Sequence, residues 1–229
     1  KYGEDNVIAV RVDHSKSADS RWYTGSGIYR DTWIVYANPV HIAQWGVYAY
    51  PEVTKNRGSL NVEVNVNNHS DKNEKVVVVN ELFDNTGKSV GKNRKTISVA
   101  GGKDSKVETK LTVSKPALWS IDNPNLYTLK TTVLLNGKEI DSSETKTGFR
   151  TYTFDPNKGF ALNGEWMKVK GVCIHHDAGV LGSAVPKDVW KRRLENLKEI
   201  GVNAIRTSHN PQAPALYELC DEMGFLVMN

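Results

Sequence analysis

The last third of the chain alternates between strand-like and helix-like segments, and this alternation limits the possible folds more than any other feature. Residues 167–174 are predicted to form a strand, and residues 202–205 are short and apolar enough for a buried one. Between them, apolar residues recur at helical spacing from 190 to 200. A second helical pattern, 216–223, leads into a third apolar run, 225–228. Strand–helix–strand repeats build parallel sheets with right-handed crossovers, so we predict three neighbouring parallel strands.

Polar side chains follow each of these predicted strands. His175 follows the first, Arg206 and His209 follow the second, and Asn229 follows the third. The carboxyl ends of parallel strands share one edge of a sheet, where α/β folds place their chemistry. A structural ion pair of Arg206 and a helix cap by His209 are the alternatives. Because Arg and His occur together at a strand end, we favour a functional site.

The middle of the chain has the pattern of a β-sandwich. Residues 60–66 alternate strictly between apolar and polar side chains, which is typical of a strand with one buried face. Further short strands follow at regular spacing, and the Asn136–Gly137 pair is a strong hairpin signal. We predict an immunoglobulin-like sandwich over residues 52–149.

Residues 1–51 are interpreted as the end of a separate β domain, with strands predicted at 7–12 and 33–36. Aromatic and basic side chains lie between these strands. We assign a structural role to Tyr29 and Arg30, and leave open whether Arg21 and Trp22 contact a sugar.

Composition excludes several classes of protein. At 229 residues the chain exceeds a typical single domain. The net charge of +4 arises from interspersed basic and acidic residues, which does not match a nucleic-acid-binding surface. No apolar run is long enough to span a bilayer. The two cysteines, Cys173 and Cys220, are too few for a disulfide framework or a four-cysteine zinc site.

Three segments together resemble glycoside hydrolase family 2, the family of β-galactosidases, β-glucuronidases and β-mannosidases. They are residues 25–30 (GSGIYR), 168–177 (KVKGVCIHHD) and 203–211 (NAIRTSHNP). The resemblance implies a multidomain β plus α/β protein. Its parts are the end of a jelly-roll sugar-binding domain (1–51), an immunoglobulin-like β-sandwich (52–149) and the first β/α units of a TIM (β/α)8 barrel (150–229).

The same resemblance implies a retaining enzyme that hydrolyses terminal β-glycosidic bonds, and the β-galactosidase branch matches best. His175 is then expected to bind the sugar, and Arg206 to orient the nucleophilic carboxylate. His209 is expected to contact the sugar or the transition state. Asp177 is either an orienting residue or a loop cap, whereas His176 is expected to be structural.

The catalytic carboxylates are expected outside this sequence. Retaining glycosidases need two carboxyl groups about 5 Å apart, and only Asp177 lies near the correct edge. Five further acids lie on the predicted helices: Glu195, Glu199, Glu218, Asp221 and Glu222. A barrel also needs eight strands, and only three are present. Both ends therefore look cut, and we expect the chain to be inactive alone.

Some residues depart from the family pattern. Asn210 stands where many members have Tyr, and Cys173 stands where several have Asn. Arg21 occupies a region where some β-galactosidases place an acidic sugar ligand, which weakens the transfer of galactose specificity. β-Glucuronidase and β-mannosidase activity therefore remain alternatives.

Two other classes of function compete with this interpretation. The first is a metal-dependent hydrolase that uses His175, His176, Asp177 and His209, although adjacent histidines on a strand point to opposite faces. The second is a non-catalytic carbohydrate-binding protein. We expect a carbohydrate substrate, no nucleic-acid or membrane partner and no cofactor. Two questions stay open: whether the full-length enzyme binds a divalent cation such as Mg²⁺, and whether it forms a homo-oligomer. We favour a periplasmic or secreted bacterial protein over a cytoplasmic one.

Overall fold

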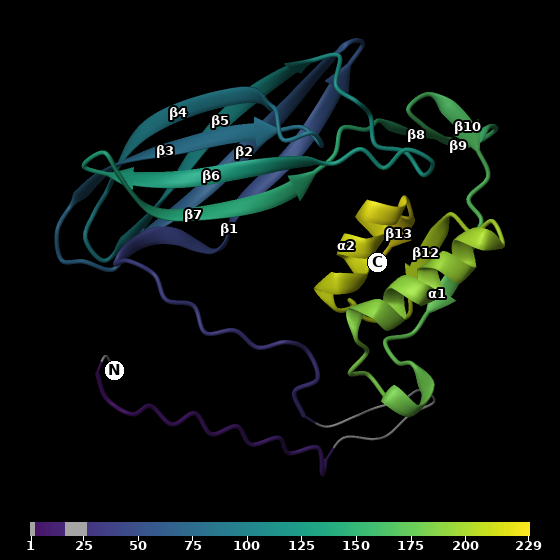
Figure 1. Ribbon diagram of the computed structural model, residues 1–229, viewed down its shortest axis with the longest axis horizontal. Coiled ribbons are helices and arrows are strands. Elements are labelled where there is room, and N and C mark those ends of the chain that lie inside the picture. Colours follow the sequence, from purple (N-terminus) through teal and green to yellow (C-terminus); the bar gives the residue numbers. More distant parts are fainter. Residues whose placement is uncertain (1–2, 17–26) are drawn as a thin grey trace.

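The computed structural model describes residues 3–16 and 27–229. Figure 1 shows a β-sandwich, a small antiparallel sheet and an α/β unit, connected in that order along the chain. Arg21 and Trp22, for which a sugar contact is left open above, lie outside the described residues. Within those residues, no helix has the length and apolar character needed to cross a membrane.

The β-sandwich consists of a three-stranded and a four-stranded antiparallel sheet. The first sheet has the order β1 (Val40–Thr54), β2 (Arg57–Asn68) and β5 (Lys103–Ser114). The second has the order β4 (Ser89–Val99), β3 (Glu74–Phe83), β6 (Tyr127–Leu135) and β7 (Lys138–Thr147).

Strict alternation places one apolar face of each central strand in the sandwich core. Val62, Val64 and Val66 of β2 are buried, and the residues between them keep contact with solvent. The predicted hairpin is confirmed, because Asn136 and Gly137 both adopt positive φ between β6 and β7. The sandwich therefore has the architecture expected from its sequence.

The expectations for the beginning of the chain need correction. Residues 7–12 and 33–36 form no strand, and their apolar side chains are exposed. An extended run becomes a strand only where another strand pairs with its backbone, and neither segment has such a pairing. Strand β1 begins at Val40 and runs through the expected domain boundary at 51/52. The sandwich thus includes residues that were assigned to the preceding domain.

A three-stranded antiparallel sheet follows the sandwich. Its strands are β8 (Tyr152–Asp155), β9 (Gly159–Leu162) and β10 (Glu165–Met167). The strand predicted over 167–174 is therefore divided, because β10 ends at Met167 and β11 begins at Gly171.

The α/β unit contains the predicted parallel sheet. Its strands, β11 (Gly171–Ile174), β12 (Ala204–Thr207) and β13 (Leu226–Met228), are parallel and adjacent in that order. The crossovers are α1 (Lys187–Glu199) and α2 (Pro214–Met223), and a 3₁₀ turn, η1 (Gly179–Leu181), precedes α1. A separate core joins these helices to the strands: Ile174, Trp190, Leu194, Ile205, Leu216, Leu219, Cys220 and Phe225.

A loop of the sandwich contacts the α/β unit. The Trp119 side chain is 1% exposed, and its Nε1 donates a hydrogen bond to the Asp221 carbonyl oxygen at 2.8 Å. Nearby, Lys198 Nζ donates to the Ile121 carbonyl oxygen at 2.9 Å. The loop thus contacts α1 and the end of α2, and it fixes the α/β unit against the sandwich.

Candidate active site

The candidate site lies where the parallel strands end. Residues 175–177 follow β11 and residues 208–212 follow β12, and we call these two segments the rim loops. The Ser208 backbone N–H donates to the Ile174 carbonyl oxygen at 2.8 Å, which holds the beginnings of the two loops together. The Ser208–His209 peptide bond is cis. Side chains from separate parts of the sequence therefore meet at one edge of the sheet, as predicted.

Arg206 is the central side chain of this edge. Its Nη1 donates to Ser208 Oγ at 3.2 Å and lies 3.9 Å from the Cys173 sulfur. Cys173 and Arg206 are also register partners on β11 and β12. Hydrogen bonds from Ser208 and from Arg206 lower the pKa of the Cys173 thiol. Arg206 itself is exposed, so its guanidinium remains accessible to an anionic group.

Two predicted histidines join this cluster. Arg206 Nη2 lies 3.5 Å from His209 Nδ1, and the His209 ring packs edge-on against His175 with centroids 5.8 Å apart. His209 thus lies between Arg206 and His175. All three side chains are exposed at the sheet edge. Together they offer several hydrogen-bond donors and one permanent positive charge to a ligand.

Asp177, the fourth predicted site residue, is held differently. Its backbone carbonyl oxygen accepts a hydrogen bond from Arg193 Nη1 at 3.3 Å, which connects the first rim loop to α1. The adjacent His176 is partly buried, and its ring centroid is 6.1 Å from that of Tyr29. The structure therefore brings His175, Arg206 and His209 together. Asp177, in the first rim loop, is held by Arg193 of α1 instead.

A partly buried hydrogen-bond network supports the second rim loop. Asn229 Oδ1 accepts hydrogen bonds from Thr207 Oγ1 at 2.7 Å and from the Tyr217 hydroxyl at 2.8 Å. The Tyr217 hydroxyl in turn accepts one from the Gln212 backbone N–H at 2.8 Å. The sequence placed Asn229 at this edge but gave no reason to connect it to Tyr217, which lies on α2. The Tyr217 hydroxyl reaches the second rim loop only because of how α2 packs in the fold.

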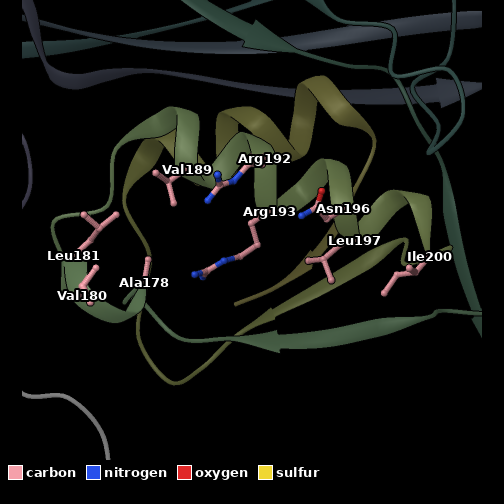
Figure 2. A pocket seen from close by; sticks show the side chains of 9 residues that line it. All are labelled: Ala178, Val180, Leu181, Val189, Arg192, Arg193, Asn196, Leu197 and Ile200. Atoms are coloured by element: carbon pink, nitrogen blue, oxygen red, sulfur yellow. The ribbon is translucent and has the colours of Figure 1, made fainter.

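A cavity of about 640 Å³ is lined by α1 and by the segment around η1. Figure 2 shows its walls, with Arg193 and Leu197 on α1 and with Ala178 and Val180 on the opposite segment. The lining does not include the three clustered side chains. Within residues 3–16 and 27–229, no group of three His, Cys, Asp or Glu side chains is arranged to hold a metal ion.

Comparison with known protein families matches almost all of the chain after residue 39. The model described as glycosyl hydrolases family 2 matches residues 40–150. A second model, described as the TIM barrel domain of glycosyl hydrolases family 2, matches residues 156–229. The boundary between the two matches agrees with the change from the sandwich to the following sheet at β8.

Individual proteins show the same similarity. A β-galactosidase of Bacteroides ovatus, BoGH2A, is 46% identical in a match 230 positions long that covers 100% of this chain and 27% of the relative. A β-glucuronidase of Bacteroides fragilis is 32% identical over 99% of this chain and 34% of the relative. The chain thus spans about a quarter to a third of these relatives.

A solved structure of a glycosyl hydrolase family 2 member from Bacteroides cellulosilyticus has the same arrangement of elements. It superimposes with a TM-score of 0.90 and 37% sequence identity, over 95% of this chain and 30% of the other. Sequence and three-dimensional comparisons therefore agree.

Proposed function

Because this chain belongs to glycosyl hydrolase family 2, we propose that the protein containing it hydrolyses terminal β-glycosidic bonds with retention of configuration, with β-galactosides as its substrates. The observation that supports this most directly is the cluster of His175, Arg206 and His209 at the carboxyl ends of neighbouring parallel strands. In a TIM barrel this edge is where substrates bind. β-Galactosides are favoured because the relative at 46% identity is named a β-galactosidase.

Arg206 is assigned to the nucleophilic carboxylate. A guanidinium beside a carboxylate stabilises the charged form, which keeps the nucleophile ionised at neutral pH. The planar group also restricts the orientation of the carboxylate, since two parallel hydrogen bonds define its plane. Ser208 and His209 contact Arg206 from one side and leave its exposed part free to face the sheet edge.

His175 and His209 are assigned to the sugar. Their rings meet edge-on, so they present ring nitrogens in different directions. Such an arrangement suits several hydroxyl groups of one pyranose ring. Asp177 is assigned an orienting role in the first rim loop.

The 229 residues alone are proposed to lack the acid/base and the nucleophile. Two acidic side chains of α1 and α2 make surface ion pairs, Glu218 with Lys187 at 3.0 Å and Glu195 with Lys191 at 4.0 Å. A retaining reaction needs two carboxyl groups about 5 Å apart on either side of the glycosidic bond. We therefore expect this chain to show no turnover by itself.

Turnover of nitrophenyl glycosides by the whole protein tests the proposal. The β-galactoside is expected to be cleaved fastest, and NMR of the first-formed sugar is expected to show the β-anomer. Faster cleavage of the β-glucuronide would identify a β-glucuronidase, as the name of the 32% identical relative suggests. Sugar binding without turnover of any glycoside would favour a carbohydrate-binding protein and contradict the proposal.

Arg206→Ala in the whole protein tests the assigned role. Loss of the guanidinium is expected to lower kcat by about 100- to 1000-fold, as for removal of one preorganised electrostatic group. Arg192→Ala provides a matched control, because Arg192 lies on α1 beside the cavity of Figure 2. Equal kcat values for both variants would contradict a role of Arg206 at the nucleophile.

A further inference from the structure

A segment from the beginning of the chain contacts both rim loops. Arg30 Nη2 donates a hydrogen bond to the Pro211 carbonyl oxygen, across 181 positions of sequence. The neighbouring Tyr29 packs its ring against His176 at 6.1 Å between centroids. The Arg30 guanidinium lies over the Tyr29 ring at 5.2 Å, which connects the two contacts. In Figure 1 the described part of this segment runs from the side of the α/β unit to the start of β1.

The contact of Arg30 falls near the end of the second rim loop. This loop is held at its start by the Ser208 N–H and at its end by the Tyr217 hydroxyl. His209 lies between these anchors. Pro211 is two residues beyond His209, and its carbonyl oxygen faces the Arg30 guanidinium. The Pro211 carbonyl and the Gln212 N–H belong to one peptide group, so Arg30 and the Tyr217 hydroxyl hold its two polar groups. A charged donor here adds to the end anchor, two residues beyond His209.

The contact of Tyr29 restricts the first rim loop. The Nδ1 atom of His176 is buried and has no hydrogen-bond partner among the described residues. Ring packing with Tyr29 therefore contributes to holding this side chain. Because His175 precedes His176, a shift of the His176 ring would also turn the backbone that presents His175.

We propose that Arg30 is a positioning residue of the active site and that the Tyr29 ring supports its guanidinium. Arg30 acts through the second rim loop on His209, and Tyr29 acts through His176 on His175. Binding groups must be held within about 0.5 Å of their productive geometry, and errors of about 1 Å can reduce rates about 100-fold. This inference rests on the proposed glycosidase function, and it makes the geometry of the α/β site depend on a segment that precedes the sandwich.

Kinetics of the whole protein provide the first test. Arg30→Ala is expected to lower kcat about 10- to 100-fold while KM changes less, because His209 is displaced relative to the transition state. Arg30→Lys retains a charged donor but not the planar group over Tyr29, so it is expected to recover part of the loss. Arg94→Ala, an exposed change on β4, is the matched control and is expected to leave kcat and Tm unchanged.

Histidine NMR of the whole protein provides a test that needs no turnover. Arg30→Ala is expected to shift the ring resonances of His209 and His176. His41 and His69 pack on each other in the sandwich at 5.2 Å, so their unchanged resonances would show that the variant is folded. Shifted site histidines with lost kcat support the inference.

The outcomes separate this inference from the proposed function. If the wild-type protein cleaves glycosides but Arg30→Ala leaves both kcat and the His209 resonance unchanged, the positioning role is overturned and the glycosidase proposal stands. If the wild type cleaves none, the proposed function fails. A shifted His209 resonance in Arg30→Ala would then still support Arg30 as the residue that sets the position of His209, and an unshifted one would overturn it.

Discussion

At the scale of single residues, the two cysteines show how position determines reactivity. Cys173 is exposed at the sheet edge, where hydrogen bonds from Ser208 and Arg206 lower the pKa of its thiol. Cys220 lies in the core between α2 and the sheet, where burial raises the pKa of its thiol to about 12. A thiolate is the reactive form of cysteine, so the two residues differ in both access and ionisation.

Alkylation of the 229-residue chain is expected to distinguish these thiols. Iodoacetamide should label Cys173 below the ordinary thiol pKa near 9, because its folded-state pKa is lowered. Cys220 should remain unlabelled until the chain unfolds, since it stays buried and protonated up to a pH of about 12. Mass spectrometry of the labelled peptides across a pH series measures both.

Ser208→Ala tests the cause of this difference. It removes the larger of the two hydrogen bonds that lower the pKa of Cys173, so the labelling midpoint should move to higher pH. Labelling of Cys173 and Cys220 at the same rate in the folded chain, or an unchanged midpoint in Ser208→Ala, would contradict this account.

Residue-scale prediction succeeded where strand order alone determines position. The convergence of His175, Arg206 and His209 follows from parallel strands, whatever the loop details. The interaction of Asp177 with α1 depends on the path of a loop and on the long Arg193 side chain, and neither has a sequence signature. Their functional roles remain predictions.

At the scale of secondary-structure elements, the alternating pattern was sufficient for the sandwich. Strand β3 has Val76, Val78 and Leu82 in the core, and Asn80 occupies the remaining inward position with 0% exposure. Its side chain accepts a hydrogen bond from Thr131 Oγ1 at 2.7 Å and donates one to Thr109 Oγ1 at 3.0 Å. Alternation predicts that Asn80 points inward but cannot identify partners on β6 and β5.

Asn80→Ala is expected to destabilise the sandwich by about 2 kcal/mol, because a buried polar group left without a partner costs about 1–3 kcal/mol. Urea unfolding followed by circular dichroism measures the change. Asn65→Ala on the outward face of β2 is the control, and its effect should stay within about 0.5 kcal/mol. Equal destabilisation by both variants would contradict a stabilising role for the hydrogen bonds that join Asn80 to Thr109 and Thr131.

At the scale of the whole molecule, the sequence indicated the order of the modules but not how they dock. The joining contacts are made by backbone carbonyl groups, with Trp119 bonded to Asp221 and Lys198 bonded to Ile121. The Arg150 guanidinium also lies over the Trp119 ring at 5.0 Å. Carbonyl groups occur at every position, so no residue pattern marks this interface. An experiment on this interface must therefore change the distance between the backbone at the end of α2 and that of the sandwich loop.

Gly224→Ala does this, because Gly224 ends α2 directly against the sandwich loop. A Cβ atom there would lie 2.2 Å from the Ile121 carbonyl oxygen, and φ is +75°. Gly201, which ends α1, has a similar φ of +83°, but a Cβ atom there would meet nothing within 4 Å. Both alanine variants carry about 1–2 kcal/mol of left-handed backbone strain, so the difference between them measures the docking contact.

We expect Gly224→Ala to lower the Tm of the chain further than Gly201→Ala does. It should also speed the exchange of the Trp119 indole proton with solvent, since the clash separates this ring from the Asp221 carbonyl oxygen. Calorimetry and NMR-detected hydrogen exchange measure these effects. Only Gly224→Ala forces an atom against the Ile121 carbonyl group. If the two variants have the same Tm and the indole proton stays protected in both, the loop around Trp119 does not hold the modules together.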